Sequence, residues 1–241
     1  MKIVDAVWEK RNLGVDVTEI VCEASDSKEE LISVLSKVNT PYSLCKIPSG
    51  SAELLVCAQE QGYQVIEMSI AMEGKTKELS LPRIYQRFAS EISVRDADEE
   101  QTEQVLREIE FGSIFKTDRI ALDPHFGEEA AGRRYANWTR DLIEQGAHVC
   151  IGYYKDVPAA FGVNQDKEGA VSHDVLGGVL GNSVGVGLGF LSAYSNLVSA
   201  IRYGNVKVVA YVSSNNPAII HLRQHFGFQI TEMQYVLVKH Q

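Results

Sequence analysis

Two stretches of the chain repeat one another. QGYQVIEMSIAME spans residues 61–73, and FGFQITEMQYVLV spans residues 226–238. Gly62 aligns with Gly227 at an offset of 165 residues (227 − 62), and a Gln, a Glu and a Met follow at the same spacing. In both stretches the glycine follows a segment with helical periodicity, and alternating apolar residues come after it. Each stretch therefore predicts the end of a helix followed by a strand.

The same offset aligns further predicted elements. In the first part of the chain, VDVTEIVCEA at residues 15–24 alternates like a strand, and Ser27 with Glu30 forms a capping-box pattern at a helix start. The offset superimposes the predicted helices 27–39 and 51–61 and the predicted strand 42–48 on residues 192–204, 216–226 and 207–213. We interpret the repeat as a duplicated half-domain. The alternative is a chance likeness of two α–β units.

A polar stretch without periodicity, EGKTKELS at residues 73–80, favours a domain boundary. We expect an N-terminal domain at residues 1–76 and a second domain at residues 77–241. The second domain reads as a strand, two helices, a hairpin around KDVP, a strand, a glycine-rich loop, a helix, a strand, a helix and a final strand. This order predicts the α/β class with a mixed sheet.

The composition excludes several classes of partner. The chain has 241 residues and a net charge of −9, which argues against a nucleic-acid partner. No apolar run approaches the ~20 residues of a membrane helix, and MKIVDAVWEK at the start lacks the apolar core of a signal peptide. We therefore expect no membrane partner and a cytoplasmic location. The four cysteines form no C-x-x-C pair, so we expect buried free thiols without chemistry.

VGVGLG at residues 184–189 lies between a predicted strand and a predicted helix. Glycines allow positive φ, and backbone N–H groups at a helix N-terminus can bind a diphosphate. The aligned residues 19–24 of the first part hold two glutamates and no glycine, and should repel such an anion. The loop matches neither the dinucleotide-binding spacing nor a Walker A motif. Glycines that serve only a turn or close helix packing are the alternative.

This loop resembles the [Q/R]-x-x-G-x-G/A pyrophosphate loop of the GNAT acetyltransferase superfamily, with Val184 in place of the usual polar residue. NNPAIIHLRQHFGF resembles the N-x-x-A-x-x-x-Y-x-x-x-G-F segment of that family, with Asn216, Gly227 and Phe228 in register. ISVRDADEEQTEQVLREI resembles its opening strand and helix. Together these segments cover residues 90–240.

The rest of the chain resembles one branch of the superfamily. WEKRNLGVDVTEI and FKTDRIALDPHFGEEAAGRRYANW are similar to segments of the TDP-fucosamine acetyltransferases. Those enzymes place a reduced GNAT-like half before the catalytic domain. The resemblance therefore implies a GNAT fold with an additional N-terminal partial GNAT-like domain.

The resemblance also implies acetyl-CoA as the co-substrate, held by the glycine-rich loop and its surroundings. A backbone N–H near the end of the preceding strand would polarise the thioester carbonyl. The residues implied to bind acetyl-CoA are Val179, Leu180, Val184, Gly185, Val186, Gly187, Leu188, Gly189, Asn216 and Arg223.

The family usually has a Tyr four residues before the Gly-Phe pair, which protonates the leaving thiolate. This chain has Arg223 there, and an arginine does not give up its proton at neutral pH. Arg223 can instead stabilise the thiolate by charge or bind the cofactor. Substitutes for the acid are Tyr235 and Tyr211 on the flanking strands, with core or half-core packing as the alternative, and His221 or His225 on the helix.

Two further predictions concern the base and a metal. His173 precedes Asp174 at the start of a predicted strand, and it is a candidate base on the acceptor side, with a plain polar pair as the alternative. His221 and His225 have the spacing of metal ligands on a helix. No third ligand lies near them in the sequence, so we expect no metal.

The acceptor would meet the polar segment between two predicted helices. Lys116, Asp118, Arg119 and Asp123 lie in this predicted loop, and charged loops often bind ligands. The resemblance implies that this region faces the acceptor, so Lys116, Asp118 and Arg119 are the predicted substrate-binding residues. Capping and packing are the alternative roles.

Two functions follow. The first is an acetyl-CoA-dependent N-acetyltransferase that acts on a small amine, for example an amino sugar on a nucleotide carrier. The second is a non-catalytic GNAT-like module that binds acyl-CoA or a partner, and Arg223 at the position of the acid favours it. Expected partners are the small amine and, as an option, a second copy of the chain.

Overall fold

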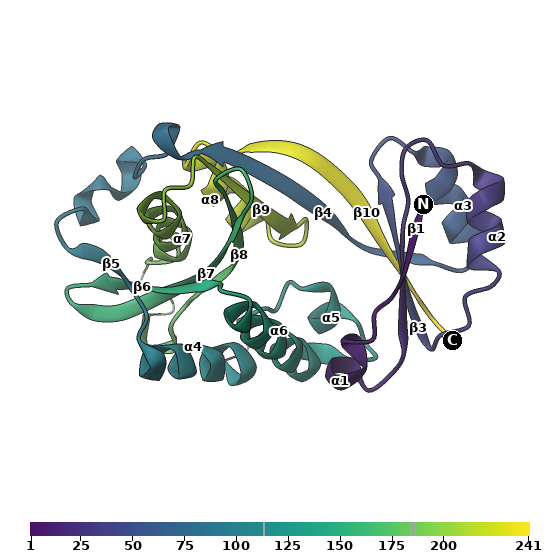
Figure 1. Cartoon of the computed structure of the whole chain (residues 1–241), viewed down its shortest axis with the longest axis horizontal. Coiled ribbons are helices and arrows are strands. Elements are labelled where there is room, and N and C mark those ends of the chain that lie inside the picture. Colours follow the sequence, from purple (N-terminus) through teal and green to yellow (C-terminus); the bar gives the residue numbers. More distant parts are fainter. Residues whose placement is uncertain (113, 184, 186) are drawn as a thin grey trace.

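The computed structural model describes residues 1–112, 114–183, 185 and 187–241. The strands in these residues form one mixed, ten-stranded sheet in the order β1-β2-β3-β10-β4-β9-β8-β7-β6-β5 (Figure 1). The strands are β1 (Lys2–Asp5), β2 (Val17–Val21), β3 (Tyr42–Pro48), β4 (Gln64–Lys75), β5 (Ile92–Asp96), β6 (His148–Tyr154), β7 (Val157–Lys167), β8 (Val171–Val179), β9 (Lys207–Ser213) and β10 (Gln229–His240).

Helices cover both ends of this sheet. They are α1 (Glu9–Leu13), α2 (Lys28–Leu35), α3 (Ala52–Glu60), α4 (Glu99–Phe111), α5 (Arg119–Leu122), α6 (Gly127–Glu144), α7 (Phe190–Arg202) and α8 (Pro217–His225), with the 3-10 turns η1 (Thr76–Glu78), η2 (Arg83–Phe88) and η3 (Gly181–Ser183). Figure 1 shows α2 and α3 at one end, and α4 and α6 across the sheet from α7 at the other. No described helix is long and apolar enough to cross a membrane.

Local signals in the sequence explain several element boundaries. The predicted capping box is confirmed, because the Ser27 side chain accepts the backbone N–H of Glu30 and the Glu30 carboxylate accepts that of Ser27. The predicted hairpin is also confirmed. Lys155 and Asp156 form its two-residue turn with φ of 51° and 61°, the conformation that a tight hairpin of two twisted strands requires.

Other local expectations need correction. The predicted helix at residues 27–39 is shorter, because α2 ends at Leu35. The predicted loop that contains Asp118 and Asp123 holds the short helix α5, for which the Asp118 side chain is the N-cap. The five-residue helix α1 had no clear sequence signal. It ends at Gly14, whose φ of 78° suits glycine.

The internal repeat is a repeat of structure. The elements β3, α3 and β4 begin and end 165 residues before β9, α8 and β10, which is the offset of the sequence repeat. The helix α2 aligns with the middle of α7 at the same offset. Whether the first part descends from half of a GNAT domain stays a prediction.

The two repeated parts exchange their last strands. The strand β4 lies between β10 and β9, and β10 lies between β3 and β4, so each long strand borders the other part of the chain (Figure 1). The antiparallel pair extends from Gln229 opposite Glu73 to Val238 opposite Gln64. The sheet therefore continues through the predicted boundary after residue 76, and the division into two domains stays a prediction.

The exchange also joins the hydrophobic cores. Leu237 on β10 is fully buried, and it belongs to the cluster that Leu31 of α2 and Leu54 of α3 form against the N-terminal strands. At the other end of the sheet, Tyr85 of η2 stacks on Phe190 at the start of α7 with ring centroids 4.2 Å apart. The segment that links the two repeats thus packs on the second one.

The exchanged strand predicts a long-range effect on stability. Leu237→Ala removes a fully buried side chain from the N-terminal cluster, so the free energy of unfolding should fall by about 2–5 kcal/mol. The matched change Ile230→Ala lies on the same strand where the side chain is 42% exposed, and should cost about 1 kcal/mol or less. Urea unfolding measures both. Equal losses would contradict the placement of β10 in the N-terminal core.

Candidate active site in the split of the sheet

The sheet splits between β8 and β9. These strands run parallel and are paired from Val171 opposite Lys207 to Asp174 opposite Ala210. The strand β8 continues to Val179 and β9 to Ser213, but the described residues of these ends form no further pairs with each other. Unpaired parallel strands must diverge, because paired neighbours lie only ~5 Å apart. An opening in the sheet results.

A cavity of about 880 Å³ occupies this opening. On one side it is lined by Ser192 and Asn196 of α7 and by Arg223 of α8. On the other side it is lined by residues of α5, α6 and the strands of the N-terminal part, among them Arg119 and Glu67. The cavity therefore reaches both faces of the sheet through the split.

A buried ion pair lies in the split. The Nη1 of Arg223 donates to Oδ2 of Asp174 at 2.6 Å, and both residues are more than 90% buried. The Nδ2 of Asn196 donates to Oδ1 of the same carboxylate at 2.6 Å, so both carboxylate oxygens have partners. This network holds Arg223 as a fixed cation at the position where the resemblance implies a proton donor.

The glycine-rich loop leads into α7, whose residues Ser192 and Ala193 line the cavity, whereas Gly185, Gly187 and Gly189 are not in its lining. Gly185 and Gly187 have φ of 84° and 80°, and a Cβ at either position would meet no atom within 4 Å, so the loop backbone is open. Gly189 precedes α7 without a side-chain cap, although the N–H of Leu191 in the first turn already donates to the Leu188 carbonyl at 2.9 Å. The predicted residues Val184 and Val186 lie outside the described residues. Leu188 is buried in the core and anchors the loop.

Backbone N–H groups at the end of β8 are the candidates for a hydrogen bond to a ligand in the split. The N–H of Leu180 donates to the carbonyl of Ala159 on the β7 side at 2.9 Å, so it is not free for a ligand, and its predicted role needs correction. Peptide groups alternate in direction along a strand. The N–H groups of Val179 and Gly177 therefore point to the opposite edge, toward β9. Gly177 lines the cavity.

Comparisons with known proteins bear on the fold. No protein-family model matches the sequence, and no curated protein does. Among solved structures, a GCN5-related N-acetyltransferase from Sphaerobacter thermophilus is 13% identical with a TM-score of 0.56, over 83% of this chain and 59% of its own. One from Kribbella flavida is 12% identical with a TM-score of 0.58, over 93% and 81%. A tandem GNAT protein from the clavulanic acid biosynthesis pathway is 15% identical with a TM-score of 0.51, over 83% and 64%.

The chain has the GNAT fold. It spans less than two thirds of the Sphaerobacter and clavulanic acid pathway proteins. At these identities the likeness concerns the fold alone. The predicted likeness to TDP-fucosamine acetyltransferases stays a prediction.

On the other side of the split, charged and polar side chains of the cavity wall form a network of hydrogen bonds and ion pairs. Tyr135 donates to Oδ2 of Asp118 at 2.8 Å, and Oδ1 of Asp118 accepts the backbone N–H of Ile120 at 2.9 Å. The guanidinium of Arg119 lies 3.8 Å from the carboxylate of Glu67. The predicted residues Asp118 and Arg119 therefore lie in the cavity wall, whereas Lys116 is exposed and does not line the cavity.

Glu67 is the functional candidate that the sequence analysis missed. It lies on the exchanged strand β4, is 8% exposed and lines the cavity. Burial raises the pKa of its carboxyl above the ordinary value, although Arg119 and the Ser213 hydroxyl act in the opposite direction. The signal in the sequence was the glutamate shared by the two repeats, but only the exchange carries Glu67 into this site.

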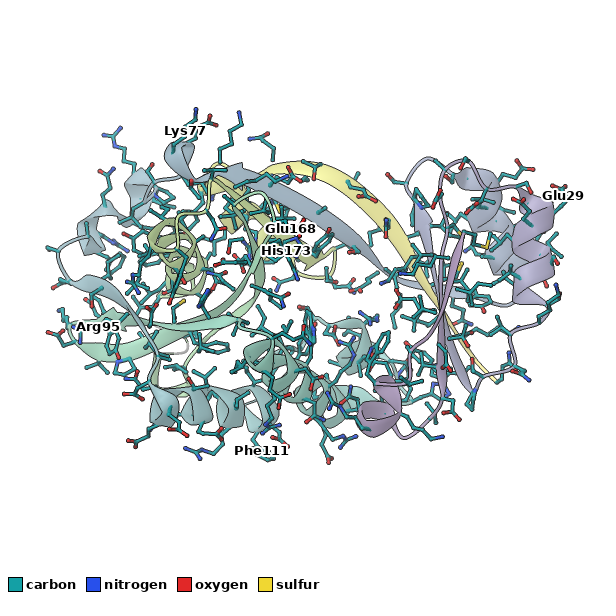
Figure 2. The ribbon with its side chains drawn as sticks, viewed as in Figure 1. Glu29, Lys77, Arg95, Phe111, Glu168 and His173 are labelled. Atoms are coloured by element: carbon teal, nitrogen blue, oxygen red, sulfur yellow. The ribbon has the colours of Figure 1, made fainter. Side chains whose placement is uncertain are left out.

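His173 and Tyr211 line the cavity between these two walls. Their rings meet edge to face with centroids 6.2 Å apart, and Figure 2 shows His173 near the middle of the molecule. Burial, and next the charges of Lys167 and Lys207, lower the pKa of His173, so its imidazole is neutral at pH 7 and can accept a proton. The predicted cofactor residue Asn216 lies nearby as the N-cap of α8.

Three predicted acids lie elsewhere. Tyr235 packs against the N-terminal cluster around Leu237 and does not line the cavity, so its predicted role as an acid does not fit this placement. The reason is the exchange, which carries the second half of β10 past the split. His221 and His225 are exposed on α8 and do not line the cavity.

The ion pair predicts an asymmetric pair of variants. Asp174→Ala leaves the Arg223 guanidinium buried without its partner, so the free energy of unfolding should fall by about 3–5 kcal/mol. The double variant Asp174→Ala with Arg223→Met removes the buried charge as well and should recover much of this loss. Urea unfolding measures both. A double variant as unstable as the single one would contradict an energetically coupled pair.

Proposed function

We propose that this protein is an acetyl-CoA-dependent N-acetyltransferase that acts on a small amine. The observation that carries the proposal is the cavity through the split between β8 and β9. The first turn of α7, which follows the open glycine loop, lines it through Ser192, and the buried carboxylate of Glu67 and the neutral imidazole of His173 also line it. A thioester that enters from the loop side would meet an amine from the other side.

The loop side suits the anionic part of acetyl-CoA. Backbone N–H groups around Gly185, Gly187 and the first turn of α7 can bind the diphosphate without a cationic side chain. The N–H groups of Gly177 and Val179, which point toward the split, can donate to the thioester carbonyl and stabilise the oxyanion. The acetyl group would then lie in the split, near the Asp174–Arg223 pair.

The acceptor side supplies the base. The amine attacks the thioester carbon as a neutral nucleophile, so its proton must leave, and Glu67 or His173 can accept it directly or through a water. The departing thiolate is negatively charged. Arg223 can stabilise it by its fixed positive charge, and a water can protonate it.

The charges of the cavity wall favour a cationic acceptor. Each of the cations Arg119, Arg134 and Lys46 already faces a carboxylate, at 3.8 Å, 2.7 Å and 2.6 Å. Asp174 is paired in the same way with Arg223, and the six carboxylates of the described lining outnumber its four cations. A protonated amine is attracted to such a wall, whereas an acceptor with a diphosphate needs these ion pairs to rearrange. An amino sugar on a nucleotide carrier remains one candidate acceptor to include in a screen of small amines.

A non-catalytic acyl-CoA-binding module is the second candidate function. The observation that favours it is the Asp174–Arg223 pair at the position of the family's proton donor. In that case acetyl-CoA binds, but no amine is acetylated at a rate above the uncatalysed reaction.

The loop is tested by calorimetric titration with acetyl-CoA and with free CoA. Wild-type protein should bind both, and Gly187→Glu should abolish binding, because it places a carboxylate and a strained backbone at the diphosphate site. The matched control is Gly169→Glu. Gly169 has a φ of 77° and equally open surroundings, but it lies in the turn between β7 and β8.

Two results would overturn the proposal. Folded wild-type protein that binds neither acetyl-CoA nor CoA is not an acetyl-CoA enzyme. A Gly187→Glu variant that binds acetyl-CoA as well as Gly169→Glu would place the cofactor elsewhere. Binding without acetyl transfer in a screen of small amines would favour the acyl-CoA-binding module.

The base is tested by pH profiles of kcat/KM. Glu67→Gln should lower kcat/KM by about 10²–10⁴ at pH 7 and leave acetyl-CoA affinity unchanged. A base acts when deprotonated, so activity rises with pH through its pKa. For Glu67 this rise lies above the usual glutamate value of ~4.3, and for His173 it lies below ~6.5.

His173→Gln is the matched variant. If Glu67 is the base, its replacement removes the rising limb and His173→Gln keeps it. The reverse outcome would assign the base to His173, and a limb that survives in both variants would exclude both residues.

A further inference from the structure

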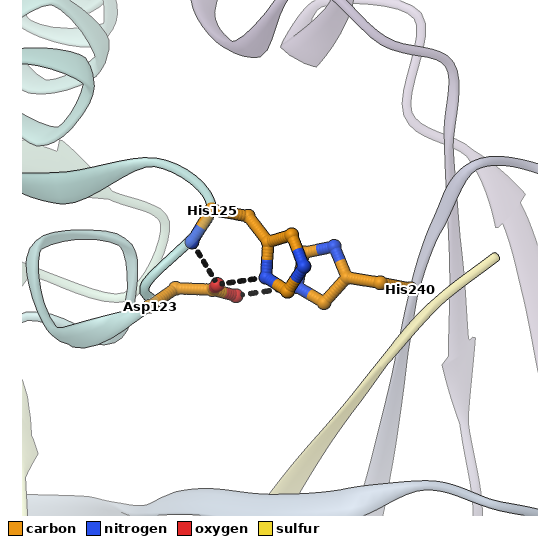
Figure 3. A group of neighbouring side chains, drawn as sticks. All are labelled: Asp123, His125 and His240. Atoms are coloured by element: carbon orange, nitrogen blue, oxygen red, sulfur yellow. Dashed lines mark hydrogen bonds and ion pairs between the residues drawn. The ribbon is translucent and has the colours of Figure 1, made fainter.

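Asp123, His125 and His240 form a cluster away from the cavity. Asp123 follows α5, His125 lies two residues later, and His240 is the last residue of β10. Each side chain offers one ligand atom, and these atoms all lie within 4.8 Å of one another. Figure 3 shows both imidazoles turned toward the carboxylate of Asp123.

The distances suit a small divalent ion. His125 Nδ1 lies 3.2 Å from Oδ1 of Asp123, and His240 Nε2 lies 2.8 Å from Oδ2. Ligands of a tetrahedral zinc ion lie ~3.3 Å apart, because the metal–ligand bonds are about 2.0 Å. The two imidazoles stack with ring centroids 3.7 Å apart, so both rings must turn for their nitrogens to reach a common ion.

Packing holds two of the ligands, Asp123 and His240, in place. The Asp123 carboxylate is 2% exposed, and it also accepts the backbone N–H of His125 at 3.0 Å. The His240 ring packs on Tyr42 and Phe126, with ring centroids 4.8 Å and 5.5 Å away. His125 is 62% exposed, so an ion can enter from solvent and a water can complete its coordination.

We propose that Asp123, His125 and His240 bind one divalent transition-metal ion of the zinc class. Two imidazole nitrogens and one carboxylate oxygen favour zinc, copper, nickel or cobalt over magnesium or calcium, which prefer oxygen ligands alone. The site is a structural clamp. It ties the end of β10 to the end of α5, and α5 carries Arg119 into the wall of the cavity.

This proposal stands apart from the enzymatic one, because it depends on neither acetyl-CoA nor the split. It also differs from the expectation of no metal. That expectation concerned His221 and His225, which have no third ligand near them in the sequence, whereas the tertiary structure gathers three ligands here. The histidine pair on α8, His221 and His225, therefore serves as a control for zinc binding elsewhere on the chain.

The test uses the full, untagged chain after removal of metal by a chelator. Calorimetric titration with Zn²⁺ should give one ion per chain, and the melting temperature should rise on addition of Zn²⁺. With Cu²⁺, the electron paramagnetic resonance spectrum should show coordination by two imidazole nitrogens. His125→Gln and His240→Gln should each weaken Zn²⁺ binding at least about 10-fold and remove the thermal shift.

Two controls keep the result specific. The double variant His221→Gln with His225→Gln removes the exposed pair on α8 and should bind Zn²⁺ like the wild type. His148→Gln removes a histidine that also faces one carboxylate, that of Asp166 at 3.1 Å, and should likewise have no effect. His125 is exposed, so His125→Gln should fold even if His240→Gln does not.

Any of three outcomes would overturn the proposal. The first is no Zn²⁺ binding by the folded wild-type chain. The second is wild-type affinity in His125→Gln. The third is loss of binding in the α8 double variant, which would assign the ion to His221 and His225. In the first two cases, Asp123 and the histidines form a hydrogen-bonded clamp without metal.

Discussion

The antiparallel pairing of β4 with β10 is the interaction on which the rest of the structure depends. Each of these strands closes the repeat that it belongs to and also borders a strand of the other repeat. The pairing joins ten strands into one sheet and takes Leu237 into the N-terminal core. It also carries Glu67 into the cavity at the other part of the sheet.

The split between β8 and β9 is the second constraint. Divergent strands leave backbone groups without partners in the sheet, and such groups are costly unless something hydrogen-bonds to them. The Asn196 side chain donates to the Leu176 carbonyl at 3.0 Å and to Asp174 at 2.6 Å, and the Asp174–Arg223 pair occupies the opening. The backbone N–H groups that face this opening, such as that of Gly177 in the cavity lining, are the reason for the proposed acetyl-CoA site. The divergence of β8 from β9 thus shapes both the sheet and the proposed site.

The sequence predicted the fold well where the signals are local. Capping pairs, helix-ending glycines and alternating strands act over a few residues, so the ends of α8 and β10 and the hairpin turn could be read directly. The strand order could not, because β4 and β10 carry the same local pattern whichever neighbour they pair with. For the same reason Tyr235 was predicted near the thioester, although β10 takes it into the N-terminal core.

The sequence by itself determined the repeat, the glycine-rich loop and the Arg at the position of the family's Tyr, because these are properties of residues close along the chain. Only the tertiary structure decided what surrounds them. It paired Arg223 with Asp174, buried Glu67 and thereby raised its pKa, and brought His240 to Asp123 and His125. Such effects depend on burial and on distances between atoms. Asp174 and Arg223 are 49 positions apart and Asp123 and His240 are 117 apart, so these pairs come into contact only when the chain folds.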